Sequence, residues 1–142
     1  MGNSNFSQYT LYFHEAVVPL LEQIGHRLTH VTLEKFKFVD VALIGETCPK
    51  LKYLKMSRIL SFCNVEVVSK SVYRQLEELY ILNTKGCRVT PATVRQLLAN
   101  SENLRILHLQ FIASFTDKLC TDIIKENEMT LLNSVIFEQC HG

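Results

Sequence analysis

The sequence lacks the features that direct a chain into a membrane, out of the cell or onto nucleic acid. No uninterrupted apolar run approaches the roughly 20 residues that cross a bilayer. Residues 1–7 are polar and have neither the basic start nor the apolar core of a signal peptide. Neither sign of charge is in excess, because 15 Lys and Arg oppose 14 Asp and Glu. We therefore expect no membrane and no nucleic-acid partner, and a location in the cytoplasm or the nucleus.

The cysteines are odd in number and widely scattered, which argues against a disulfide framework. In a chain without an export signal, such a set indicates free thiols in a reducing compartment. Free cysteine is among the most frequently buried residue types, so we expect these side chains to fill the core. The five are Cys48, Cys63, Cys87, Cys120 and Cys140.

What the sequence does contain is a short pattern that recurs five times, apolar at its first, fourth and sixth positions. Successive copies begin 23, 25, 28 and 28 residues apart, within the roughly 20–29-residue period of leucine-rich repeats. Polar residues alternate with the fourth and sixth positions, so each copy predicts a short strand whose apolar face only stacking can bury. The copies are Leu28–Leu33, Leu51–Met56, Leu76–Ile81, Leu104–Leu109 and Leu132–Phe137.

The predicted fold is therefore an α/β leucine-rich-repeat solenoid, a short horseshoe of about five parallel strands with helices on the convex side. We expect residues 1–142 to form a single leucine-rich-repeat domain, with residues 1–12 as a flexible N-terminus. Val135 and Phe137 would lie uncovered at the C-terminal end of the stack. We therefore expect further repeats or a partner at that end.

The segments between the strands carry helix signals. An amphipathic pattern ends at Gly25, and Pro19 within it fits only the first turn of a helix. The inner face of that helix is predicted to be Phe13, Ala16, Val17, Leu20, Leu21 and Ile24. Residues able to cap a helix N-terminus stand before four later segments. These caps are Asp40, Asn64, Thr90 (followed by Pro91) and Thr116.

Two stretches resemble the cysteine-containing leucine-rich repeats of F-box/LRR proteins. Residues 41–56, VALIGETCPKLKYLKM, run from a helix through Cys48-Pro49 into a strand. Residues 90–109, TPATVRQLLANSENLRILHL, share this layout with Ser101-Glu102-Asn103 replacing the Cys-Pro pair. The resemblance spans residues 13–142 and implies the substrate-recognition arm of a Skp–cullin–F-box ubiquitin ligase.

The chain departs from that family in two ways. The segment before the first repeat is too short for an F-box, so Skp–cullin components are expected partners only of a form that carries one. A stand-alone scaffold with no ubiquitin role is the alternative. The position three residues after each strand core, usually Asn or Cys, is mostly apolar here, so we expect apolar packing to replace the usual hydrogen-bond ladder. Those residues are Phe36, Ile59, Thr84, Ile112 and Cys140.

The residues between the buried strand positions are predicted to face away from the helices, onto the concave surface that solenoids use for binding. Tyr53, Tyr80, Ile106 and Ile136 would form an interaction hot spot there for a protein partner. The alternative is that these side chains only favour strand formation or are covered by neighbouring repeats. The whole predicted site is His30, Thr32, Glu34, Tyr53, Lys55, Ser57, Glu78, Tyr80, Leu82, Ile106, His108, Gln110, Ser134, Ile136 and Glu138.

We expect no catalytic activity, no cofactor and no metal site. The sequence has no nucleophile elbow and no phosphate-binding glycine loop, and its closest metal-ligand pair is the adjacent Cys140-His141. One basic cluster surrounds Tyr53, but strand alternation should separate its members, and Glu34 and Glu78 should neutralise Lys55. We interpret that cluster as a solvated strand edge rather than a nucleic-acid site. It comprises Lys50, Lys52, Lys55 and Arg58.

Overall fold

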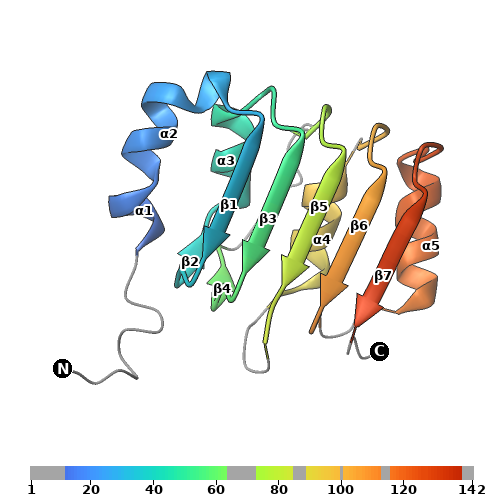
Figure 1. The fold of residues 1–142 in the computed structure, drawn as a ribbon. Coiled ribbons are helices and arrows are strands. Elements are labelled where there is room, and N and C mark those ends of the chain that lie inside the picture. Colours follow the sequence, from blue (N-terminus) through green and yellow to red (C-terminus); the bar gives the residue numbers. More distant parts are fainter. Residues whose placement is uncertain (1–11, 64–72, 85–88, 100, 113–115, 139–142) are drawn as a thin grey trace.

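The computed structural model describes residues 12–63, 73–84, 89–99, 101–112 and 116–138. Its centre is a five-stranded parallel sheet whose strands follow one another in chain order, with helices packed on one face (Figure 1). The predicted α/β class and the five parallel strands are confirmed. The strands are β1 (His30–Glu34), β3 (Tyr53–Ser57), β5 (Glu78–Leu82), β6 (Ile106–Gln110) and β7 (Ser134–Glu138).

The five strands pair without any slip in register. His30 pairs with Tyr53, Tyr53 with Glu78, Glu78 with Ile106 and Ile106 with Ser134. Because side chains alternate between the two faces of a strand, this register places equivalent positions of all five copies on the same face. The fourth and sixth positions of the inner copies are completely buried, so the repeated pattern builds one continuous core.

A turn closed by the same backbone hydrogen bond precedes each strand of this sheet. The backbone N–H of the first leucine of each copy donates to the carbonyl three residues earlier, and the residue that supplies this carbonyl is buried every time. The five acceptors are all different residue types, so the sequence indicated the equivalence only for Cys48 and Ser101. The pairs are Leu28 to Gly25, Leu51 to Cys48, Leu76 to Tyr73, Leu104 to Ser101 and Leu132 to Met129, at 3.0, 3.2, 3.2, 3.1 and 3.4 Å.

Three of the four predicted helix caps are confirmed. Asp40 Oδ1 accepts the Leu43 N–H at 3.1 Å at the start of α3 (Val41–Thr47). The Thr90 hydroxyl accepts the Thr93 N–H at 3.3 Å before α4 (Pro91–Leu98), and Thr116 caps α5 (Asp117–Glu126) in the same way. The helix predicted after Asn64 lies outside the described residues.

The N-terminal helix differs from its prediction. The segment divides into α1 (Phe13–Ala16) and α2 (Val18–Ile24), followed by the 3₁₀ turn η2 (Gly25–Arg27). Pro19 lies in the first turn of α2, as predicted. Phe13, Val17 and Leu21 are buried at intervals of four residues, so the inward face is narrower than predicted. Ala16 and Leu20 were wrongly assigned to the inner face: both are exposed, Leu20 by 51%. These helices close the β1 end of the sheet (Figure 1).

Gly25 lies where two backbone segments meet. A Cβ atom at this position would lie 2.5 Å from the backbone oxygen of Thr47 and 3.3 Å from the sulfur of Cys48. Its φ of −54° is an ordinary helical value, so close approach rather than backbone conformation explains the glycine. The end of α3 and the turn before β1 can therefore pack directly against each other.

The positions after the strands mostly show the expected apolar packing. Phe36, Ile59 and Ile112 are all buried. The third copy departs from this pattern, because Thr84 is exposed and the preceding Asn83 is buried instead. Asn83 Oδ1 accepts the Ile59 N–H at 3.2 Å, so a side-chain hydrogen bond to the neighbouring copy persists there, displaced by one residue.

Two features of these turns were not predicted. Lys35, Arg58 and Phe111 adopt positive φ values of 65°, 54° and 57° at the same position of three copies, where the chain leaves its strand. A second, two-stranded parallel sheet then joins β2 (Phe38–Val39) to β4 (Ser61–Phe62). Strands of two residues are too short to show an alternating pattern in the sequence.

Candidate partner-binding face

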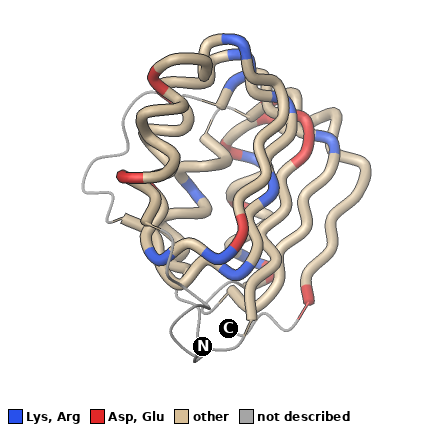
Figure 2. Tube along the Cα trace, turned by 60° about the vertical axis from the view of Figure 1, so that its left-hand side comes forward, with Lys and Arg blue, Asp and Glu red and all other residues tan. Residues whose placement is uncertain are grey.

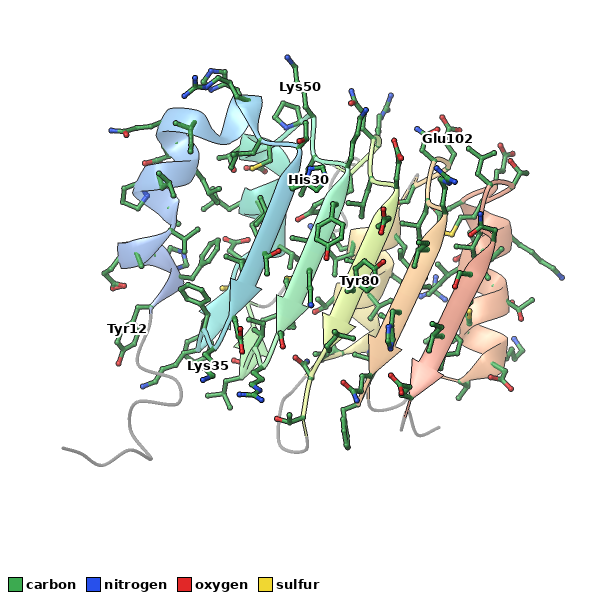
Figure 3. The ribbon with its side chains drawn as sticks, viewed as in Figure 1. Tyr12, His30, Lys35, Lys50, Tyr80 and Glu102 are labelled. Carbon is green, nitrogen blue, oxygen red and sulfur yellow. The ribbon has the colours of Figure 1, made fainter. Side chains whose placement is uncertain are left out.

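All fifteen predicted site residues lie on the face of the sheet that the helices leave uncovered, here called the open face (Figures 1 and 3). The register arranges them in three rows across the strands, each read from β1 to β7. The first row is His30, Tyr53, Glu78, Ile106 and Ser134; the second is Thr32, Lys55, Tyr80, His108 and Ile136; the third is Glu34, Ser57, Leu82, Gln110 and Glu138.

Four aromatic rings cross the open face in a continuous series, here called the ring row. The rings of His30 and Tyr53 stack with centroids 5.4 Å apart and planes inclined by 22°. Tyr53 and Tyr80, which are diagonal neighbours, are also 5.4 Å apart, and Tyr80 lies 6.1 Å from His108. The sequence placed both tyrosines and both histidines on this face but did not predict that their rings contact one another. It missed the row because ring contacts depend on the register between copies, which only the paired strands define.

Hydrogen bonds hold three rings of the row. The Tyr80 hydroxyl donates to Glu78 Oε1 at 2.7 Å, and His108 Nε2 lies 2.6 Å from Glu138 Oε1. His30 Nδ1 lies 2.9 Å from the hydroxyl oxygen of Thr29. Partial burial, the hydrogen bond to Glu78 and the charge of that carboxylate raise the pKa of Tyr80 to about 12. Tyr80 therefore remains a protonated donor over the whole physiological pH range, and the ring row presents ordered side chains to a partner.

Lys55 is not neutralised in the way predicted. Among the described residues, ion pairs form between Arg95 and Glu126, Lys118 and Asp122, and His108 and Glu138 if the histidine is protonated; none involves Lys55. The prediction failed because Glu78 binds the neighbouring hydroxyl of Tyr80 instead.

The charged side chains of the basic cluster are separated along the fold. Lys50 and Lys52 precede β3, Lys55 lies within it and Arg58 follows it, so the cluster is spread along the whole length of this strand. Lys and Arg are intermixed with Asp and Glu along the chain in the view of Figure 2.

The β7 end of the sheet is apolar and accessible. Val135 is 41% exposed and Ile136 42%, whereas Leu107, which pairs with Val135, is completely buried. Leu131, just before the strand, is 53% exposed, and Phe137 is only partly buried. The predicted exposure of Val135 and Phe137 is therefore present in the structure, and what covers them stays a prediction.

The described thiols are placed as core side chains. Cys48 and Cys120 are buried and Cys63 is half-buried, and all three are free. Burial raises the pKa of each thiol, with the nearby Asp40 adding to the effect at Cys63 and Asp117 at Cys120. A raised pKa leaves the thiolate, the reactive form, scarce at neutral pH. Cys87 and the Cys140-His141 pair lie outside the described residues.

On the helical side, Arg95, Ala99, Glu126 and Asn127 line a hollow of about 250 Å³. A salt bridge of 2.7 Å from Arg95 to Glu126 joins two of these residues. Within the described ranges, no three His, Cys, Asp or Glu side chains are grouped as metal ligands would be. None of the helices in this part of the chain is long and apolar enough to span a bilayer.

Comparison with known proteins assigns no family. No family model, no curated protein and no solved structure matches the chain.

Proposed function

We propose that this chain is a leucine-rich-repeat solenoid that binds a protein partner through its open face. In this proposal it serves as the substrate-recognition arm of an F-box-type ubiquitin ligase adaptor and has no catalytic activity of its own. The single observation that carries the binding role is the ring row, a continuous set of aromatic side chains on a face that the protein's own helices do not cover.

The repeating unit supports the solenoid assignment. Each copy has the same turn, a parallel strand in the same register and the same alternation of inward and outward positions. The inward side chains are incompletely buried only at β7. Neighbouring copies pair directly, whereas copies further apart do not. Contact limited to nearest neighbours is the defining property of repeat proteins.

The composition of the open face supports protein binding. Interfaces are enriched in aromatic side chains, and energetic hot spots cluster where large rings lie centrally within the contact. Tyr53 and Tyr80 occupy β3 and β5, the second and third of the five strands, with Ile106 and Ile136 toward the C-terminal edge. Five strands at about 4.8 Å spacing give a surface roughly 20 Å wide, enough for a peptide or the edge of a small domain.

The proposed ligase role is based on the likeness of residues 41–56 and 90–109 to F-box/LRR repeats. The structure of these segments is compatible with it: α3 ends at Thr47, and the buried Cys48 supplies the turn that leads through Leu51 into β3. Ser101, completely buried, has the equivalent role before β6. Co-purification of the gene product from cells with a Skp-type subunit would support this role. Partners without any ligase subunit would favour the stand-alone scaffold.

The binding role is tested by capture of proteins from cell lysate with the wild-type chain and a Tyr53→Ala/Tyr80→Ala variant. A Tyr12→Ala/Phe38→Ala variant is the control, because it also removes two aromatic rings, both exposed, but lies off the open face. We expect a partner that is lost with the first variant and retained with the second, both variants being folded by circular dichroism. Equal capture by all three chains would refute the proposed site.

A further inference from the structure

We infer that the open face selects a basic segment of its partner, one that carries an arginine or lysine and an apolar anchor about three residues away. This inference rests on the proposed function, since it names the chemistry that the same face would recognise. It is drawn from the charges, the ring row and the apolar side chains that the register places together.

The charged side chains of the open face are predominantly acidic. Glu34, Glu78 and Glu138 contribute three carboxylates, on β1, β5 and β7, against the single ammonium group of Lys55 on β3. Glu34 and Glu138 are exposed, and Glu78 is half-buried. The charge of the whole chain is close to balanced, so the open face is more acidic than the chain as a whole. A cationic partner segment is therefore attracted here, and an acidic one repelled.

The ring row adds a second reason to favour a cation. The quadrupole of an aromatic ring attracts a cation over its face, and a planar guanidinium can also stack on the ring. Glu78 uses Oε1 to accept from Tyr80, so its charge stays beside the rings of Tyr53 and Tyr80. A guanidinium lying over these two rings would meet the carboxylate at the same time.

The C-terminal half of the open face supplies the apolar contact. Ile106 on β6 and Ile136 on β7 are diagonal neighbours, and Ile136 is 42% exposed. The distance across the sheet from the tyrosine pair to these isoleucines is about two strand spacings, or roughly 10 Å. A segment in the polyproline II conformation covers that distance in about three residues at roughly 3.1 Å each, and its three residues per turn bring residue i+3 to the same side as residue i. A segment laid across the strands would thus place a basic side chain on the rings and an apolar one on the isoleucines.

The test begins with selection of random 12-residue displayed peptides on the immobilised full chain, with the Tyr53→Ala/Tyr80→Ala variant as counter-selection. We expect arginine or lysine to be enriched together with an apolar residue about three positions away. Enrichment of Asp and Glu would overturn the inference while leaving the proposed binding face intact. Failure to enrich any peptide over the counter-selected variant would count against both.

The strongest selected peptide is then measured by fluorescence polarisation against charge variants. Glu78→Gln keeps an oxygen to accept from Tyr80 but removes the charge, and Glu34→Gln removes an exposed charge; we expect binding at least about threefold weaker for each. Lys55→Gln should bind more tightly, because it removes the only opposing charge. Glu77→Gln, which precedes β5, is the control and should leave affinity unchanged. Unchanged or tighter binding by both Glu78→Gln and Glu34→Gln would overturn the inference.

Discussion

Leu107 and Val135 occupy equivalent positions in adjacent strands and pair with each other, but only Leu107 is completely buried. Truncating a buried leucine to alanine removes apolar contact and leaves a cavity, which costs roughly 2–5 kcal/mol. Val135→Ala removes two carbon atoms, worth about 0.8 kcal/mol each when buried. With 41% of Val135 exposed, the expected loss is about 1 kcal/mol.

Urea denaturation followed by circular dichroism measures both losses. We expect Leu107→Ala to lower the free energy of unfolding by about 3 kcal/mol, and Val135→Ala by about 1 kcal/mol. Equal losses at the two positions would refute the reasoning, because they would mean that the inner side of β7 is as well covered as that of β6. A dependence of the Val135→Ala loss on protein concentration would identify the cover as another copy of the chain.

Three further predictions concern the core. Gly25→Ala brings a Cβ within 2.5 Å of the Thr47 oxygen and should lower stability by about 1–3 kcal/mol, so an unchanged melting temperature would contradict the packing described. Burial raises the pKa of Tyr73 well above its ordinary value of 10.0, so the folded state keeps a proton that the unfolded state loses. Stability should therefore be intact below pH 10 and fall above it; Tyr73→Phe should show a smaller loss between pH 8 and pH 11, and an identical loss would exclude this role. Cys48 and Cys120 should react with iodoacetamide far more slowly in the native protein than in urea, and mass spectrometry showing rapid native labelling would refute their burial.

Much of the fold could be predicted from the sequence because the same pattern occurs in it five times. A single Leu-x-x-Leu-x-Leu stretch is ambiguous, but five copies at similar spacing imply parallel strands stacked in order. The caps at Asp40, Thr90 and Thr116 were also readable, since a cap is a local interaction between a side chain and a backbone N–H two or three residues away. Position on the open face followed from alternation along each strand.

The errors arose where the deciding contact is not local. Leu20 fits an ideal helical stripe, but only Phe13, Val17 and Leu21, spaced by four residues, are buried, and how far the core extends around a helix depends on what packs against it. Asn83 lies one residue before the position where the usual ladder residue is expected. Only its hydrogen bond with the Ile59 N–H shows that it has the role of a ladder residue. The partners of Glu78 and His108 likewise depended on side-chain directions that composition and spacing do not define.

The most direct test of the central claim is the dissociation constant of the isolated partner for three chains: the wild type, Tyr53→Ala/Tyr80→Ala and the Tyr12→Ala/Phe38→Ala control. Loss of two central rings from a protein interface is expected to weaken binding by at least about tenfold, while the control should match the wild type. Equal affinity of all three folded chains would show that the partner binds elsewhere and that the ring row is not its site.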